Sequence, residues 1–231
     1  MMGDQIVPVD IIGKDYIVTR GGLTSGDEAA YIMPVENNTK IYVNGNATPI
    51  ATLFAGQTYR YDITNAQDYY YFTASKPVYM LHASGFGCEL GEAILPPLNC
   101  AGSRKATIVR SQGDPRTFIL NLIVRAGHQD AFVLNGGAYT NNTTVIQASD
   151  FTVVPGTGGQ WMAAKKEYTT DAVFATNVAY TISNTEDVFA LGMVNGGSST
   201  GCRYGYFSEY VGRIYVNAGN DTTICKLDTL S

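Results

Sequence analysis

The stretch of sequence most informative about the fold is Thr39-Lys40-Ile41-Tyr42-Val43-Asn44-Gly45-Asn46. Its first five residues are rich in the β-branched and aromatic side chains that favour strands. The Asn-Gly pair that follows tolerates positive φ at both positions, which a tight hairpin turn requires. The stretch therefore predicts a β-strand that ends in a hairpin turn.

The same alternation of apolar and polar residues continues along the chain. It predicts further strands at residues 52–54, 58–63, 69–73 and 78–82. Because proline lacks the N–H that a strand donates to its neighbour, Pro77 is expected at the first residue of a strand or on an edge. Residues 89–95 alone hint at a helical turn, which Pro96-Pro97 would end. The pattern as a whole predicts an all-β fold with little helix.

Composition supports strands and excludes several classes of partner. Of the 231 residues only 15% are charged, whereas 25 are glycine and 16 are tyrosine; a typical domain has about 25% charged residues. The net charge of −5 argues against a nucleic acid partner and against an anionic membrane surface. No apolar run approaches the ~20 residues that span a bilayer, so direct membrane insertion is not expected. The length allows one large domain or two small ones.

Four landmarks occur twice in the same order, which suggests an internal repeat. Residues 40–45 resemble residues 131–136, residues 56–59 resemble 159–161, and residues 78–81 resemble 188–191. A glycine-rich turn and a cysteine, Cys88 or Cys202, follow the last of these. Two β-sandwich units of about 100 residues each would explain the pattern; chance recurrence of short strands is the alternative. The predicted boundaries are 1–100 and 101–216, with residues 217–231 beginning a further unit.

The cysteines favour a disulfide over a metal site. None of the four lies in a CxxC pair, and His82 and His128 are far from any zinc-ligand spacing. Cys88 and Cys100 bracket a short segment that a disulfide would close, contributing about 3 kcal/mol of stability. Two buried free thiols are the alternative. The sequence leaves the partners of Cys202 and Cys225 open.

The catalytic patterns in the sequence are weak. Residues 197–201 (Gly-Ser-Ser-Thr-Gly) fit the G-x-S-x-G nucleophile motif, which needs a helix and then a histidine downstream. Both histidines precede this segment, so we interpret it as a turn. Asp150 with Glu167, or Glu186 with Asp187, could form a glycosidase pair, but solvated positions at strand ends explain them better. The sequence predicts no catalytic residue, no metal and no cofactor.

Tyr69, Tyr70 and Tyr71 are the candidate binding residues. They belong to a dense group of tyrosines between residues 59 and 79. Alternation along a strand puts Tyr69 and Tyr71 on one face and Tyr70 on the other. Tyrosines on a sheet face can stack on sugars or anchor a protein partner. Packing between neighbouring strands is the alternative for each of them.

Four segments of the first half belong together as a motif set: residues 13–16 (Gly-Lys-Asp-Tyr), 36–45 (Glu-Asn-Asn-Thr-Lys-Ile-Tyr-Val-Asn-Gly), 53–59 (Leu-Phe-Ala-Gly-Gln-Thr-Tyr) and 74–79 (Ala-Ser-Lys-Pro-Val-Tyr). With them, the chain resembles the N-terminal domain of IgG Fc-binding proteins and its bacterial relatives, over about residues 13–216. Residues 217–225 resemble the opening of immunoglobulin-like repeats in Bacteroidetes surface proteins. The resemblance implies a secreted, multidomain, adhesin-like parent protein with further domains after residue 231. It implies no catalytic residues.

Three functions are consistent with these observations. The first is an extracellular or cell-surface binding module for a host glycoprotein, a mucin or another glycan or protein. The second is a structural spacer with no specific ligand, and the third, least supported, is a glycan-active hydrolase. Residues 1–5 contain neither the basic nor the apolar region of a signal peptide.

Overall fold

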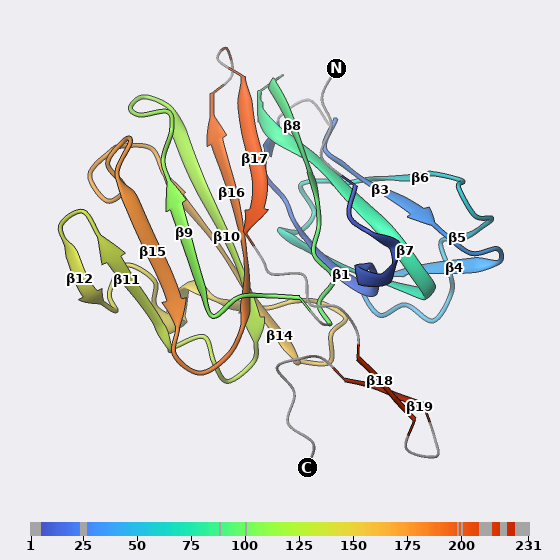
Figure 1. The fold of residues 1–231 in the computed structure, drawn as a ribbon. Helices are drawn as coiled ribbons and strands as arrows, with labels where there is room; N and C mark the ends of the chain where they lie inside the picture. Colours follow the sequence, from blue (N-terminus) through green and yellow to red (C-terminus); the bar gives the residue numbers. More distant parts are fainter. Residues whose placement is uncertain are drawn as a thin grey trace.

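The computed structural model describes residues 6–23, 27–87, 89–99, 101–197, 199, 201–207, 214–217 and 221–224. Almost all of its regular structure is β, which confirms the all-β prediction. Two single-turn 3-10 helices, η1 (Val9–Ile11) and η2 (Ala148–Asp150), accompany nineteen described strands. Figure 1 shows two bodies of strands side by side, one from each half of the chain.

The first half of the chain forms one eight-stranded sheet, in which β7 pairs with five other strands. Its strands are β1 (Gly13–Thr19), β2 (Gly22–Leu23), β3 (Ala29–Pro34), β4 (Thr39–Val43), β5 (Ala51–Leu53), β6 (Tyr59–Asp62), β7 (Tyr69–Gly87) and β8 (Glu89–Ile94). After β4 the chain turns at Asn44 and Gly45, both with positive φ, as the Asn-Gly pair predicts. Buried residues of β1, β3, β4 and β7 share one apolar core.

Two details of this half correct the sequence prediction. Pro77 lies inside the 19-residue strand β7 and not at a strand start. It causes no loss of pairing because residues 75–77 lie where β7 changes partners, between the registers with β4 and with β3. The predicted helical turn at residues 89–95 is wrong, since residues 89–94 form β8. There antiparallel pairing with β7 overrides the local preference.

The second half of the chain forms a sandwich of two sheets. Its strands are β9 (Lys105–Val109), β10 (Thr117–Arg125), β11 (Phe132–Gly136), β12 (Tyr139–Asn142), β13 (Thr152–Val153), β14 (Trp161–Tyr168), β15 (Ala179–Asn184), β16 (Phe189–Gly196) and β17 (Cys202–Phe207). The five-stranded sheet has the order β13-β14-β10-β16-β17, and the four-stranded sheet has the order β12-β11-β15-β9. Strands β18 (Ile214–Asn217) and β19 (Asp221–Ile224) form a separate hairpin.

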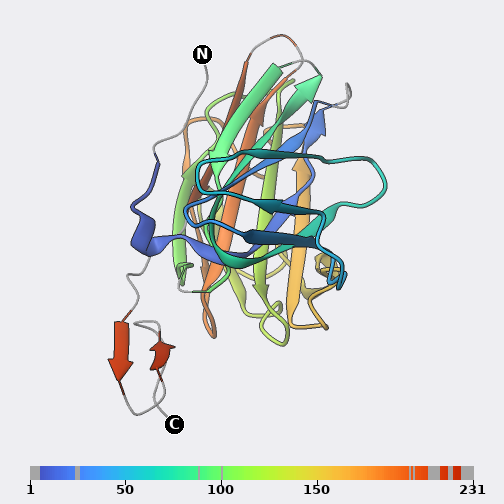
Figure 2. The same ribbon diagram turned by 90° about the vertical axis from the view of Figure 1, so that its right-hand side faces the viewer.

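The five-stranded sheet is covered on both faces. Strand β10 shows this most clearly, because its residues 118–124 are all buried. Phe118 and Leu120 belong to the core shared with the four-stranded sheet. Ile119 and Ile123 pack on the opposite side, against residues of the first half such as Ile17 and Phe86. In Figure 2 the eight-stranded sheet accordingly lies in front of the second half.

Strand pairing follows the same order in the two halves. The run β6-β3-β7-β8 in the first half corresponds to β14-β10-β16-β17 in the second, and β5-β4-β7-β1 corresponds to β12-β11-β15-β9. In the first half the two runs share the single strand β7, whereas in the second half β15 and β16 are separate. Tyr70 and Tyr180 occupy equivalent places on β7 and β15, and each hydroxyl accepts a backbone N–H five or six residues upstream. An internal duplication predicts these correspondences.

Candidate functional site

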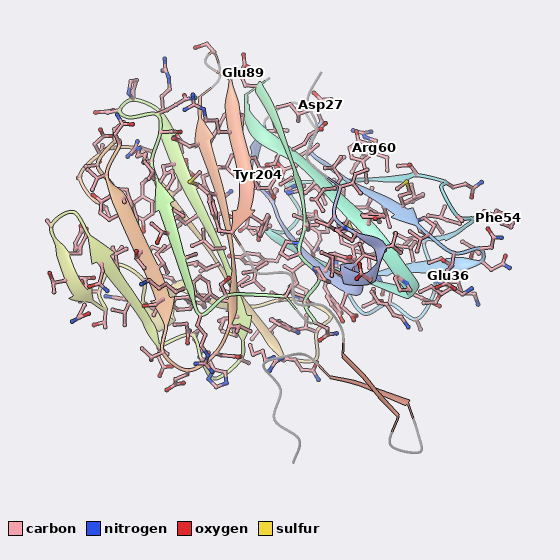
Figure 3. The ribbon with its side chains drawn as sticks, viewed as in Figure 1. Asp27, Glu36, Phe54, Arg60, Glu89 and Tyr204 are labelled. Atoms are coloured by element: carbon pink, nitrogen blue, oxygen red, sulfur yellow. The ribbon has the colours of Figure 1, made fainter. Side chains whose placement is uncertain are left out.

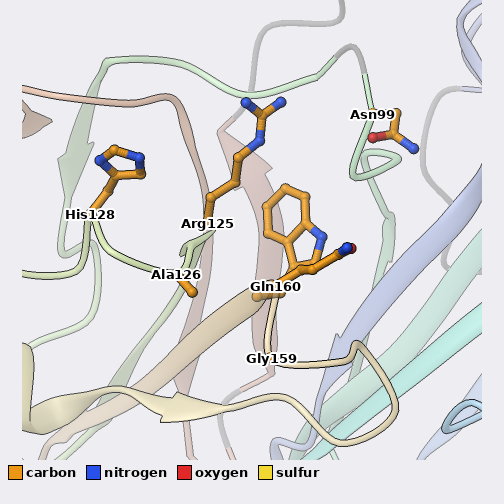
Figure 4. A pocket seen from close by; sticks show the side chains of 7 residues that line it. Asn99, Arg125, Ala126, His128, Gly159 and Gln160 are labelled. Atoms are coloured by element: carbon orange, nitrogen blue, oxygen red, sulfur yellow. The ribbon is translucent and has the colours of Figure 1, made fainter.

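An open hollow of about 490 Å³ lies where β10 ends and β14 begins (Figure 4). Its lining residues are Asn99, Arg125, Ala126, His128, Gly159, Gln160 and Trp161. Arg125 and Trp161 stand opposite each other in the ladder between β10 and β14. The Ala126 N–H donates to the Gln160 carbonyl at 2.9 Å, and the Val154 N–H donates to the Trp161 carbonyl at 2.9 Å. Backbone pairing therefore fixes the floor of the hollow.

Trp161 is the only tryptophan in the chain. Its ring is partly buried and packs against the cluster that contains Ile17, Ile123 and Ala163, between the two halves. The rest of the ring contributes to the wall of the hollow. The indole is therefore held from behind by the core and presents an apolar surface to a ligand.

The polar side chains of the hollow are positioned from one side by Asn184, which is 2% exposed. Its amide donates to the His128 carbonyl at 2.7 Å and accepts the N–H groups of Glu186 and Asp187 at 3.0 Å. His128 Nδ1 then lies 3.0 Å from Glu186 Oε2, and Arg125 Nε lies 4.0 Å from Asp187 Oδ2. These contacts hold the cation and the imidazole beside the hollow before any ligand arrives.

The three candidate tyrosines lie in different surroundings. Tyr70 is only 3% exposed, and its ring belongs to the core of the first half. Tyr69 and Tyr71 are partly buried and pack on the same cluster as Trp161. The Tyr71 hydroxyl donates to Asp15 Oδ1 at 3.0 Å. Burial, followed by the charge of Asp15, raises the pKa of Tyr71 well above its usual value.

A second polar cluster is enclosed between the halves. Glu28 Oε1 accepts the Gly21 N–H at 2.5 Å and the Ser84 hydroxyl at 3.1 Å, and lies 3.0 Å from His82 Nε2. His82 Nδ1 is 2.7 Å from the hydroxyl of Tyr204 on β17, which is marked in Figure 3. Burial raises the pKa of Glu28, but the hydrogen bond and charge of His82 and the two donors outweigh it and lower the pKa. Because His82 is fully buried, this cluster joins the halves and does not face a ligand.

The structure gives no support to the catalytic patterns. After residues 197–201 the chain enters strand β17, not the helix that a nucleophile motif needs. Asp150 pairs with Lys166 Nζ at 2.5 Å. Glu186 lies beside the His128 imidazole and Asp187 lies beside the Arg125 guanidinium at the hollow. Among the described residues, no group of three His, Cys, Asp or Glu side chains could hold a metal ion.

Of the four cysteines, the structure describes Cys202. Cys88 and Cys100 lie outside the described residues, so their disulfide remains a prediction. Cys202 is a free, partly buried thiol. Burial, with the charges of Glu89 and Glu28, raises its pKa to about 12, so the thiol is protonated and unreactive at neutral pH. In the part of the chain that the structure describes, no helix has the length and apolar character to cross a membrane.

Sequence reasoning missed the hollow. Its signals were present: a lone tryptophan opens a strand directly after a glycine-rich loop at residues 156–159. What the sequence could not show is that Arg125 and His128, more than thirty positions earlier, stand beside that ring. The ladder between β10 and β14 creates this neighbourhood.

Comparison with known proteins yields one match. Residues 1–191 match a family model described as "IgGFc binding protein". No curated protein and no solved structure matches the chain.

Proposed function

This chain belongs to the IgGFc-binding protein family, and on that basis we propose that it is a non-enzymatic binding module that acts outside the cell. Its partner is a host or cell-surface protein or glycan. The family membership supports a binding role. The carboxylates of Asp150, Glu186 and Asp187, which the sequence offers as members of a glycosidase pair, lie beside basic side chains instead of facing another carboxylate across a cleft.

The hollow at Trp161 is the observation that carries the choice of binding site. It combines an aromatic ring with an exposed cation, an imidazole and two amides. Tryptophan and arginine are among the residues that contribute most of the binding energy at recognition surfaces. Arg125 is 48% exposed at its side chain and His128 is 38% exposed, so both groups are accessible to a partner. Tyr69 and Tyr71 form a second candidate contact, farther inside the junction.

A binding screen of the purified chain by biolayer interferometry tests the proposal. The panel contains immunoglobulin Fc, intestinal mucin and immobilised glycans. We expect saturable binding to at least one of them, weakened in Trp161→Ala and kept in Phe54→Ala, which removes an aromatic ring that is 54% exposed elsewhere on the surface. The double variant Tyr69→Ala/Tyr71→Ala tests the second candidate contact. No binding by the wild-type chain across the panel would refute the proposed function and favour a structural spacer.

A further inference from the structure

We infer that the hollow at Trp161 binds the glycan part of a partner, with a pyranose ring stacked on the indole; this rests on the proposed function. The hydroxyls of the sugar would then be bound by the polar side chains around the ring, Asn99, Arg125, His128 and Gln160. The inference names the ligand class of the site, which neither the family match nor the fold assigns.

The lining decides between a sugar and an apolar ligand. Pockets for apolar small molecules are walled mainly by aliphatic and aromatic side chains. Among the described residues that line this hollow, Trp161 is the only large apolar side chain, Ala126 is the only aliphatic one, and four side chains carry hydrogen-bonding groups. A pyranose has one face of C–H groups and a rim of hydroxyls, so it matches a single flat ring surrounded by donors and acceptors.

The size and shape of the hollow favour a sugar over a protein surface. A stable protein interface covers about 800 Å² on each partner. The hollow is a much smaller, open site of about 490 Å³, within the roughly 300–1,000 Å³ of small-ligand pockets. Gly159 also lines the hollow, and no atom lies within 4 Å of where its Cβ would be, which leaves room for the rest of a glycan chain.

The charges at the hollow are arranged for hydrogen bonding to hydroxyls. None of the described residues that line the hollow has a carboxylate. Glu186 and Asp187 stand behind His128 and Arg125 and pair with them, so the positive charge at the hollow is partly balanced. The guanidinium presents several N–H donors in a fixed plane, and the amides of Asn99 and Gln160 both donate and accept.

The lone tryptophan provides a direct assay, because all tryptophan fluorescence of the chain comes from this site. Sialyllactose, N-acetyllactosamine and chitobiose are titrated into the wild-type chain. We expect a saturable change in tryptophan emission with at least one of them. Calorimetry then compares variants: Trp161→Ala should weaken binding about tenfold or more, Trp161→Phe should retain most of it, and Phe54→Ala should be unchanged.

Because Trp161 also packs on the core, Gln160→Ala serves as the second variant. Gln160 is exposed, and its backbone holds it in place, through its N–H to the Thr157 carbonyl and its carbonyl to the Ala126 N–H. This variant should therefore fold and still weaken glycan binding several-fold. If both Trp161→Ala and Gln160→Ala bind the glycan with wild-type affinity, the assigned site is wrong.

A glycoprotein probe separates the inference from the proposed function. If Fc or mucin binds, enzymatic removal of its glycans should abolish binding. If the deglycosylated protein binds equally well, the glycan inference is wrong and the binding module stands. If neither the oligosaccharides nor any glycoprotein, with or without its glycans, binds the wild-type chain, both the inference and the proposed function are wrong.

Discussion

Replacing Glu28 with glutamine should lower the free energy of unfolding by about 2 kcal/mol, whereas Glu186→Gln should lower it by less than about 0.5 kcal/mol. The two glutamates form matched pairs. Glu28 and Glu186 each lie 3.0 Å from a histidine nitrogen, of His82 and His128 respectively. They differ in burial: the side chains of the first pair are 3% and 0% exposed, and those of the second are 54% and 38% exposed.

The magnitude follows from what Glu28 Oε1 accepts. Three groups reach it, the Gly21 N–H, the Ser84 hydroxyl and His82 Nε2. A hydrogen bond to a charged group contributes about 1.5–3 kcal/mol, against about 0.5–1.5 kcal/mol for a neutral one. Glutamine keeps an oxygen at this position but loses the negative charge, so each of the three hydrogen bonds weakens by roughly 1 kcal/mol. Part of this loss of stability is offset because the variant no longer buries a charge.

The dependence on pH has a definite sign. The pKa of Glu28 is lower in the folded chain than its usual value, so its carboxylate stabilises the fold fully above the unfolded pKa of about 4.3. This contribution is lost as the pH falls from about 4.3 through the lowered pKa. Glu28→Gln lacks the titrating group, so the part of the acid dependence that comes from Glu28 should disappear in the variant.

Equilibrium unfolding in urea, followed by tryptophan fluorescence at several pH values between 7 and 3, measures both effects. Trp161 packs between the halves, so its emission reports on their separation. Equal losses of stability in Glu28→Gln and Glu186→Gln would refute the reasoning, because the two pairs differ in burial and in the number of groups that the carboxylate accepts. An unchanged acid dependence in Glu28→Gln would refute the argument from pKa.

Two further perturbations test the packing of loops and strands. Gly156→Ala should destabilise the chain by about 2 kcal/mol or more, because its φ is +81° and a Cβ would lie 2.2 Å from the Asn44 carbonyl carbon. Gly158→Ala, at φ +63° with nothing within 4 Å, should cost only about 1 kcal/mol, and similar thermal melting temperatures for the two would contradict the loop contact. Tyr180→Phe removes the bond from the Ala175 N–H to the hydroxyl and should cost about 1 kcal/mol in chemical denaturation; a neutral effect would show that this hydroxyl does not stabilise the fold.

The sequence predicts the fold class well because strand patterns and turns are local. The Asn-Gly turn has the predicted positive φ at Asn44 and Gly45. The repeat landmarks fall on strands with equivalent pairing, but the third pair is one residue out of phase. Val78 faces the core of the first half, whereas its aligned partner Val188 lies outside β16 and Phe189 faces the core of the second. Short apolar runs do not specify which side of a strand is buried.

The binding hollow was harder to predict because it depends on long-range pairing. A run of tyrosines marks residues 69–71 in the sequence, yet the ladder of β7 with β1 directs Tyr70 into the core and Tyr69 and Tyr71 into the junction. Conversely, the sequence around Arg125 is typical of a solvated strand end, and only the pairing of β10 with β14 in the structure places Trp161 beside it. Clustering along the chain is therefore a weak guide to clustering on the surface in a fold built from antiparallel ladders.

The equivalence of the two halves leads to a last prediction, that each chain has one glycan site and not two. In the first half β3 and β6 pair as β10 and β14 do in the second. Trp161 is the only tryptophan of the chain. Residues 33–35 and 56–58, which flank the pairing of β3 with β6, contain neither tryptophan nor arginine. The first half therefore lacks both the ring and the cation of the hollow. Calorimetric titration of a binding oligosaccharide should give a stoichiometry near one per chain, and a value near two would show that the fold, and not these side chains, creates the site.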